Sequence, residues 1–373
     1  MRIGIDAKWY FRGPPSGRRV IRSLVHALIA VAGAEDELHF FLDDRSRGEI
    51  PEGAHRAQCR YVWGRVNQLG NLYPIPRAAD ALSLDVVVYQ NFAPPRAVAH
   101  HARIAFVHDV IFAERPEFYT WQERAYFAPL RALSTRADRV CTVSESEKTR
   151  LVRLGYADEQ RVDVVPNAVD DVFVARDALE PCHVAETLRA RGLREPFVLF
   201  VGRVTARKNV GALVSAMALV ATPGLTLVVA GPADRTSRDL AAALDASGVS
   251  ERVRFIGLVD DESLRVLYAS AALFCFPSLD ESFGFPPLEA MAAGTPTIVS
   301  RIPALEETCG HAALYVDATD PADIARAIDE LMSDPARRAV LRDEGFRQAS
   351  KFVWRDSAQR LLGSARAALA GAV

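Results

Sequence analysis

Short apolar runs alternate with longer stretches of helical periodicity along most of the chain. Each run is rich in Val, Ile or Phe and ends in a turn or polar residue, which is typical of parallel strands joined by helices. The first series of predicted strands is 2–6, 38–42, 85–90, 104–108, 140–143 and 162–165. The second is 197–201, 225–230, 253–256, 272–276, 297–299 and 313–316. Two doubly wound α/β domains are therefore expected.

The apolar rhythm weakens after Asn167, and prolines bracket a segment in which one helix, 184–191, is expected. We place a linker at 173–195, between an N-terminal domain over 1–172 and a C-terminal domain over 196–353. The end of the chain is helical only, with predicted helices over 321–332, 335–350 and 354–369.

Composition agrees with a folded two-domain protein. The 373 residues suffice for two cores, and the formal net charge of -2 argues against a general nucleic-acid-binding protein. One basic stretch, opposed by Asp6 alone, would suit an anionic lipid surface or a phosphorylated acceptor, with a solvated helix face as the alternative. It comprises Arg2, Lys8, Arg12, Arg18, Arg19 and Arg22.

The expected location is the cytoplasm. Five cysteines lie far apart without a Cys-x-x-Cys pair and are predicted to be buried thiols in a reducing compartment. No leader pattern precedes the first strand, and no run approaches the roughly 20 apolar residues of a membrane span. Peripheral contact with the inner face of the plasma membrane, through the basic stretch, stays open.

The most informative string is 279–300, LDESFGFPPLEAMAAGTPTIVS, in which a strand is followed by a glycine turn and a helix opened by two prolines. Gly284 allows close backbone approach, and the helix start would turn amide N–H groups toward a pyrophosphate. Glu289 would accept hydrogen bonds from ribose hydroxyls, and Glu281 would meet the sugar. The donor-binding loop also contains Ser282, Phe283 and Phe285. The alternative, a solvated acid and a helix-terminal charge, is disfavoured by the complete string.

A second string, 197–209, reads FVLFVGRVTARKN. A buried strand stops at Gly202, Arg203 follows at once, and Lys208 comes five residues later. Doubly wound folds bind ligands at the carboxyl ends of their strands, so two cations here would suit a diphosphate leaving group. Ordinary surface cations are the alternative.

The N-terminal half offers two weaker candidates. In the string IAFVHD a predicted strand ends at His108. This histidine would either contact a ligand or be an ordinary strand-end residue whose hydrogen bonds are made within the protein. The stretch 10–20, YFRGPPSGRRV, carries Gly13 and Gly17 in a predicted loop before a helix. It is not a G-x-G-x-x-G fingerprint, which disfavours a nicotinamide or flavin cofactor. A loop at Gly17 would close on a substrate or form an ordinary turn.

Two absences narrow the chemistry. The chain has no Asp-x-Asp pair to hold a divalent cation against a diphosphate, so we expect Arg203, Lys208 and helix dipoles to supply the charge, with no metal and no cofactor. It has no Gly-x-Ser-x-Gly elbow and no Walker loop, which argues against a hydrolase or a nucleoside triphosphatase.

These motifs together resemble the retaining GT-B glycosyltransferases of family 4, the group related to glycogen and sucrose synthases. The resemblance runs nearly end to end and rests on IGIDA, IAFVHDV, CTVSESEKTRL, VVPNAVD, FVGRVTARKNV and the Glu-x7-Glu string with its AGTP tail. The chain departs from the family pattern at Ala168, where glycine is usual, and at Arg18 and Arg19 after Gly17.

The resemblance implies two Rossmann-like domains facing a cleft. The N-terminal domain, with the C-terminal helix 354–373 crossing back to it, would bind the acceptor, and the C-terminal domain the nucleotide sugar. Residues matching Arg203 and Lys208 contact the donor phosphates in the family. The residue matching Glu289 holds the ribose there, and the one matching Glu281 lies beside the sugar. The residue matching His108 lies near the reacting centre. Retention is explained there by a front-face reaction without a protein nucleophile.

The expected activity is hexosyl transfer to a saccharide or lipid-linked acceptor in surface polysaccharide or lipopolysaccharide synthesis. GDP-mannose is our first choice of donor because similar IGIDA openings occur among mannosyltransferases; UDP-glucose, UDP-N-acetylglucosamine and a dTDP-rhamnose-type donor stay open. A nucleotide-sugar epimerase of the same architecture is an alternative, but we find no dedicated acids and bases for it. A non-catalytic nucleotide-sugar-binding protein would not need the cations, acids and histidine.

Overall fold

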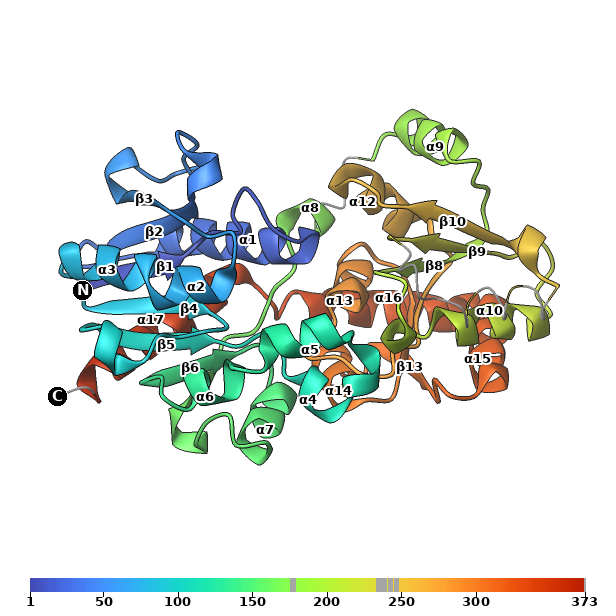
Figure 1. The fold of residues 1–373 in the computed structure, drawn as a ribbon. Coiled ribbons are helices and arrows are strands. Elements are labelled where there is room, and N and C mark those ends of the chain that lie inside the picture. The colour runs from blue at the N-terminus through green and yellow to red at the C-terminus, as the bar shows by residue number, and fades with distance from the viewer. Residues whose placement is uncertain (175–178, 233–239, 241–243, 245–247, 372–373) are drawn as a thin grey trace. The chain divides into compact units, whose positions relative to one another are not determined.

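The computed structural model describes residues 1–174, 179–232, 240, 244 and 248–371. Its contacts divide the chain into two compact units, Met1–Ala168 with Val353–Val373, and Val169–Phe352. Each unit is a parallel β-sheet with helices packed on it (Figure 1). The expectation of two Rossmann-like domains is confirmed. The predicted linker, 173–195, belongs to the second unit, and its residues 175–178 lie outside the described part.

The first unit contains a seven-stranded sheet in the order β3-β2-β1-β4-β5-β6-β7. Its strands are β1 (Arg2–Asp6), β2 (Glu37–Asp43), β3 (Cys59–Val62), β4 (Val86–Gln90), β5 (Ala102–Phe106), β6 (Arg139–Thr142) and β7 (Val162–Val164). The strand order changes direction between β1 and β4. In doubly wound folds the carboxyl ends of the strands at this switch point are where ligands bind.

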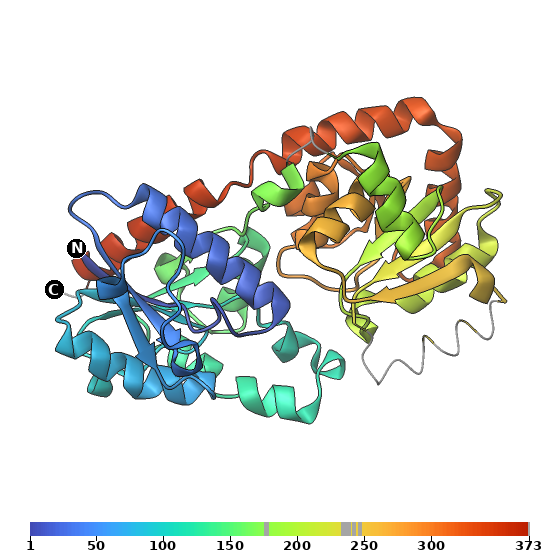
Figure 2. The same cartoon turned by 90° about the horizontal axis from the view of Figure 1, so that it is seen from above.

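Helices cover both faces of this sheet. They are α1 (Pro15–Val31), α2 (Asn67–Leu72), α3 (Pro74–Ala81), α4 (Ile111–Glu114), α5 (Trp121–Phe127), α6 (Leu130–Ser134), α7 (Glu145–Arg153) and α17 (Trp354–Ala370). Short 3-10 turns are η1 (Asp44–Ser46), η2 (Arg56–Gln58), η3 (Arg96–Val98), η4 (Pro116–Phe118) and η5 (Glu159–Arg161). Helix α17 packs against α1 and contacts β4, β5 and β6 (Figure 1, Figure 2). The predicted return of the last helix to the first unit is thus confirmed, and Ser357 Oγ ties it to the Pro166 carbonyl at 2.6 Å.

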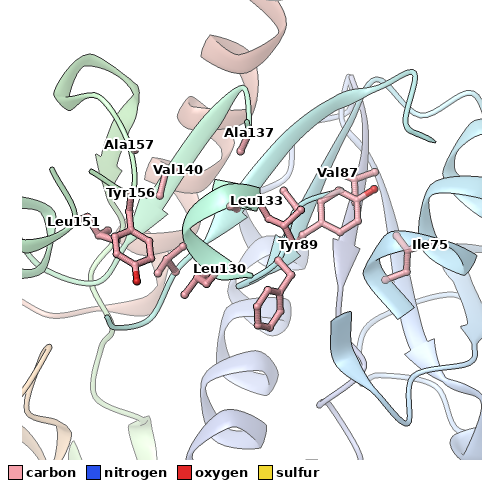
Figure 3. Packing of buried hydrophobic residues seen from close by; sticks show 14 of the residues in the cluster. Ile75, Val87, Tyr89, Leu130, Leu133, Ala137, Val140, Leu151, Tyr156 and Ala157 are labelled. Atoms are coloured by element: carbon pink, nitrogen blue, oxygen red, sulfur yellow. The ribbon is translucent and has the colours of Figure 1, made fainter. Parts of the chain in front are cut away.

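Side chains of β4 that point away from α17 build the opposite half of the core. Val87 and Tyr89 pack with Ile75 of α3 and with Leu130 and Leu133 of α6 in one buried cluster (Figure 3). Every residue of β4 is buried, because helices lie on both faces of the sheet.

The second unit contains a six-stranded sheet in the order β10-β9-β8-β11-β12-β13, which reverses between β8 and β11. Its strands are β8 (Phe197–Val201), β9 (Thr226–Ala230), β10 (Val253–Gly257), β11 (Leu273–Phe276), β12 (Thr297–Ser300) and β13 (Ala313–Val316). Its helices are α8 (Asp171–Val174), α9 (Pro181–Ala190), α10 (Val210–Leu219), α12 (Asp261–Ser270), α13 (Phe285–Ala292), α14 (Pro303–Cys309), α15 (Pro321–Ser333) and α16 (Pro335–Ala349). The 3-10 turns are η6 (Ala206–Lys208) and η7 (Ser250–Arg252). Helix α13 packs on α16, and α10 on α15.

Three local expectations were wrong. Strand β3 was not predicted, because its CRYV sequence forms a sheet edge where only Cys59 and Val62 are buried, so it gives no apolar run. Strand β5 ends at Phe106, so His108 lies beyond the strand instead of at its last position. Four of the five cysteines are buried as predicted, but Cys182 is exposed on α9.

Gly4 should be intolerant of a side chain, which gives a test of the first sheet. A Cβ there would lie 2.8 Å from Phe41 Cε2 and 2.9 Å from both Leu84 Cδ1 and Val87 Cγ2. We expect Gly4→Ala to destabilise the protein by about 1–3 kcal/mol through overpacking, lowering the thermal midpoint by about 3 °C or more. The matched control is Gly363→Ala on the exposed side of α17, where a Cβ meets nothing within 4 Å and should be neutral or stabilising. An unchanged midpoint for Gly4→Ala would contradict this packing.

Candidate functional site

The carboxyl end of β8 is shaped by a close approach of two backbones. Gly202 adopts φ +151°, and a Cβ placed on Gly231 would lie 2.0 Å from the Gly202 carbonyl oxygen, so the turn requires glycine there. Arg203 follows and is exposed. The chain then forms η6 and ends it at Asn209 in the left-handed region, φ +54°. This turn carries two adjacent cations, Arg207 and Lys208.

Both cations contact one buried carboxylate, which lies in the loop after β11. Glu281 Oε1 lies 2.5 Å from Lys208 Nζ, and Glu281 Oε2 lies 2.9 Å from Arg207 Nη1. Ser278 Oγ donates to the same Oε1 at 2.5 Å, and Arg207 Nη1 also donates to the Asp280 carbonyl at 2.7 Å. We call Arg207, Lys208, Ser278 and Glu281 the Glu281 cluster. It joins the two strands at the switch point of the second sheet.

The electrostatics of the Glu281 cluster keep its carboxylate ionised. Glu281 is only 8% exposed, and burial by itself would raise its pKa, but the charges of Arg207 and Lys208 outweigh burial and lower the pKa to about 2. The carboxylate is therefore ionised near neutral pH. The cluster thus brings two cations and one carboxylate together at the carboxyl ends of β8 and β11, where a doubly wound fold binds its ligand. Lys208 Nζ also lies 4.5 Å from the centre of the Phe276 ring.

The loop between Glu281 and α13 contains the predicted donor-binding residues. Gly284 caps the helix with φ +104°, and a Cβ there would lie 2.5 Å from Leu305 Cδ2, so close packing and backbone geometry both require glycine. Phe283 is buried and its carbonyl accepts from Thr308 Oγ1 at 3.0 Å, while Ser282 and Phe285 are half-buried.

The prolines that open α13 restrict its use as an anion site. Pro286 and Pro287 have no N–H group, so two of the first four helical residues cannot donate. The backbone N–H groups that can donate at the helix start are therefore those of residues such as Phe285 and Leu288 and those of the preceding loop. The positive end of the helix dipole still faces this loop.

Glu289 is the fifth residue of α13 and is only 3% exposed. Tyr268 of α12 donates its phenol O–H to Glu289 Oε2 at 2.8 Å. Tyr268 is itself fully buried, and its carbonyl accepts from Thr295 Oγ1 at 2.5 Å. The Glu289 carboxylate is therefore held by a rigid neighbour, which preorganises it for the predicted ribose contact.

His108 lies in the first unit, on the segment that follows β5. Its Nε2 is 2.8 Å from Gln90 Oε1 at the end of β4, and its backbone N lies 3.5 Å from Asn91 Oδ1. Burial lowers the pKa of His108 to about 4, so the imidazole is neutral near pH 7.

At the start of the chain one prediction was wrong, and the alternative reading of the basic stretch holds only in part. Gly17 does not lie in a loop before a helix, because α1 already begins at Pro15, and a Cβ on Gly17 would lie 3.0 Å from the Trp9 ring. The proline start explains the difference, since its fixed φ suits the first turn of a helix. The basic stretch is not one solvated face, because Lys8 is 2% exposed and its Nζ lies 2.7 Å from Asp6 Oδ1.

Sequence reasoning missed three residues of the second-unit site. Arg207 was passed over, although its adjacency to Lys208 in a turn after a strand was a usable signal. Ser278 and Tyr268 had no local signal, because they reach Glu281 and Glu289 from other elements.

Among the described residues, no group of three or more His, Cys, Asp and Glu side chains is arranged to hold a metal ion. Within the same residues no helix has the length and apolar character needed to cross a membrane.

Two Rossmann-like units, a last helix that returns to the first unit and a charged switch point in the second define a protein of the GT-B class. Comparison with solved structures agrees. The chain is similar to sucrose-phosphate synthase from Thermosynechococcus elongatus (TM-score 0.74, 20% identity, 99% of both chains covered). It is also similar to HepE of Anabaena, solved in complex with UDP and glucose (TM-score 0.72, 19% identity, 98% and 100% covered). At these identities the likeness concerns the fold.

Family models match both units. The model of glycosyl transferases group 1 matches residues 187–348, and the model of Glycosyltransferase Family 4 matches residues 17–173. The chain therefore belongs to the family 4 glycosyltransferases of GT-B fold.

The chain is similar to curated relatives over part of their length. O-antigen chain mannosyltransferase B of Escherichia coli is 27% identical over 66% of this chain and 65% of its own length. D-inositol 3-phosphate glycosyltransferase of Nocardia farcinica is 36% identical over 64% of this chain and 54% of its own. The chain thus spans between half and two thirds of these relatives.

The Glu281 cluster predicts a specific effect of pH on stability. We expect Glu281→Gln to lower the free energy of unfolding of the second unit by about 3 kcal/mol at pH 7, because Arg207 and Lys208 would lose their counter-charge. The folded pKa of about 2 lies below the usual glutamate pKa of 4.5, so the contribution is present above about pH 5 and is lost as pH falls toward 2. The difference in thermal midpoint between wild type and variant should be smaller at pH 4 than at pH 7.

The control is Glu306→Gln, which removes an exposed carboxylate 3.2 Å from Arg301. It should change stability by less than about 1 kcal/mol. Equal midpoints for wild type and Glu281→Gln at pH 7 would refute the role of the cluster.

Proposed function

We propose that this protein is a retaining glycosyltransferase that moves a hexose from a nucleotide sugar to a saccharide or lipid-linked acceptor, in the synthesis of a surface polysaccharide or lipopolysaccharide. The observation that carries the proposal is that Arg207 and Lys208 meet Glu281 at the switch point of the second sheet, beside the start of α13 and in the unit that matches the group 1 model. The UDP and glucose bound in HepE and the mannosyltransferase relative support a nucleotide-sugar donor.

The proposed chemistry needs charge stabilisation more than a protein nucleophile. The bond from the anomeric carbon to the donor phosphate breaks, and a bond to the acceptor oxygen forms on the same face. The acceptor proton passes to the departing phosphate oxygen. Negative charge that develops on the diphosphate would be stabilised by Lys208, Arg207 and Arg203, in a preorganised site. Glu281 would orient the first two and stabilise positive charge on the sugar.

GDP-mannose is the proposed donor. The proposal draws on the IGIDA opening of the chain and on the mannosyltransferase named among its relatives. The UDP complex of HepE keeps UDP-sugars as the main alternative.

Metal independence and a cytoplasmic location are also proposed. The case for metal independence is that Arg203, Arg207 and Lys208 offer the positive charge that a divalent cation would otherwise bring to the diphosphate. Peripheral membrane contact through the basic stretch would have to rest on its five arginines, since Lys8 is buried.

A panel of GDP, UDP and dTDP and their sugars tests the donor site by thermal shift. A nucleotide that binds the folded protein raises its midpoint, and we expect GDP and GDP-mannose to raise it most. Lys208→Ala and Glu289→Ala should weaken binding of that nucleotide by about tenfold to a hundredfold, because each removes a charged hydrogen-bonding partner of the ligand. If no nucleotide or nucleotide sugar of the panel raises the thermal midpoint of the wild type, the proposed function is refuted.

The matched control for Lys208→Ala is Lys351→Ala, an exposed lysine of the same unit. It should leave the ligand-induced shift unchanged. Equal nucleotide binding by wild type, Lys208→Ala and Glu289→Ala would contradict the site assignment.

Metal removal is a separate test. We expect turnover to change by less than about twofold after treatment with a chelator, and added manganese to have no effect. The reason is that side-chain cations would stabilise the negative charge of the diphosphate in place of a metal ion. The assay is transfer of labelled sugar with the donor that the panel selects, with a manganese-dependent transferase as the positive control. Loss of turnover that manganese restores would refute metal independence.

A further inference from the structure

The carboxyl ends of β1 and β4 in the first unit are joined by a closed ring of buried hydrogen bonds. Lys8 Nζ donates to Asp6 Oδ1 at 2.7 Å and to Asn71 Oδ1 at 2.5 Å. Gln90 N donates to Asp6 Oδ2 at 3.3 Å, and Asn71 Nδ2 donates to the Gln90 carbonyl at 3.2 Å. We call Asp6, Lys8, Asn71 and Gln90 the Gln90 ring. It lies at the switch point of the first sheet, as the Glu281 cluster does in the second.

The surroundings fix this ring tightly. Gln90 is 2% exposed, and its carbonyl also accepts from Asn67 Nδ2 at 3.1 Å. The stem of Lys8 runs past two glycines, where a Cβ on Gly64 would lie 2.5 Å from Lys8 Cδ and one on Gly70 would lie 3.3 Å from Lys8 Cε. The backbone of Gln90 is therefore held from both sides.

The side chain of Gln90 leads from this ring to His108. Gln90 Oε1 lies 2.8 Å from His108 Nε2, and with the amide in this orientation the oxygen accepts and Nε2 is the protonated ring nitrogen. His108 Nδ1 is then the ring nitrogen with a lone pair. The Gln90 amide nitrogen is buried and has no hydrogen-bond partner in the described part of the chain. A buried amide nitrogen without a partner is unfavourable for folding, so the stability of the fold does not by itself explain a glutamine at this position.

We propose that Gln90 is a positioning residue of the transfer reaction, which fixes the ring orientation and the tautomer of His108 so that Nδ1 is presented as a hydrogen-bond acceptor to a sugar hydroxyl. The proposal rests on the proposed function and on the family resemblance, which implies that the residue matching His108 lies near the reacting centre. The Gln90 ring gives it the rigidity that a positioning residue needs.

The charged groups near His108 determine how a test is interpreted. They are Asp109, next to it in the chain, Asp6 and Lys8 in the Gln90 ring, and Glu147. Glu147 Oε1 accepts from Val110 N at 2.7 Å, and burial raises its pKa to about 8. The low pKa of His108 comes from burial, so a carboxylate placed at position 90 would be a new charge in contact with the imidazole.

Three variants test the proposal. Gln90→Glu keeps an acceptor and adds a charge, while Gln90→Met removes the acceptor at similar volume. Gln359→Glu makes the same charge change on an exposed position of α17 and serves as the control. Nitrogen-15 NMR of the imidazole groups, in the protein without substrates, reports tautomer and pKa, and the His108 signals are assigned by their loss in His108→Gln.

We expect His108 in the wild type to be protonated at Nε2. Gln90→Glu should raise the pKa of His108 by about one unit or more, because an opposite charge favours the imidazolium, and Gln359→Glu should leave it unchanged. Gln90→Met should lose the fixed tautomer. A wild-type His108 protonated at Nδ1, or the same tautomer and pKa in all three variants, would overturn the proposal.

Turnover gives the second readout. Gln90→Met should lower kcat by about tenfold or more, with nucleotide binding unchanged because that site lies in the other unit. In Gln90→Glu the acid limb of the pH profile should move to higher pH, with activity recovering above it. A merely structural role would give neither the pH shift nor this recovery. If the wild type transfers no sugar, the proposed function is refuted. The NMR result then decides by itself whether Gln90 positions His108.

Discussion

The buried carboxylate of Glu281 is the constraint on which the second unit depends. A carboxylate with so little exposure stays charged only if cations compensate it, and Arg207 and Lys208 do so at 2.9 and 2.5 Å. The pair thereby ties the turn after β8 to the loop after β11. Those are the two strands between which the sheet reverses, so the charge pair fixes the geometry at the point where a doubly wound fold offers its ligand site.

The first unit solves the same problem with different residues. Lys8 and Asp6 form a buried ion pair beside β1, and Asn71 and Gln90 close the ring beside β4. Both units thus place a compensated charge at the reversal of their sheets. Buried pairs of this kind contribute little net stability, because desolvation offsets attraction. Their consistent effect is to hold side chains such as His108 and Lys208 in one place, which suits a binding or catalytic surface.

Much of the fold could be predicted because it depends on local pattern. Strands β1, β8 and β13 were placed to the residue, since each is a short apolar run bounded by turns. Strand β3 gave no such run and was missed. The same holds for the site. Gly202, Lys208, Glu281 and Glu289 stand in strings with a clear local meaning, whereas Tyr268 and Ser278 matter through hydrogen bonds to residues distant from them in the chain, which no local pattern records.

The sequence by itself determined the alternation of strands and helices, the two-unit architecture and the family, because hydrophobic periodicity and short motifs act over a few residues at a time. Only the tertiary structure decided which charges compensate one another. It paired Glu281 with Arg207 as well as Lys208, buried Lys8 against Asp6 and set Gln90 against His108. The physical reason is that electrostatic and hydrogen-bond energies depend on distance and burial, and both are set by strand order and chain crossing, which bring together residues far apart in sequence.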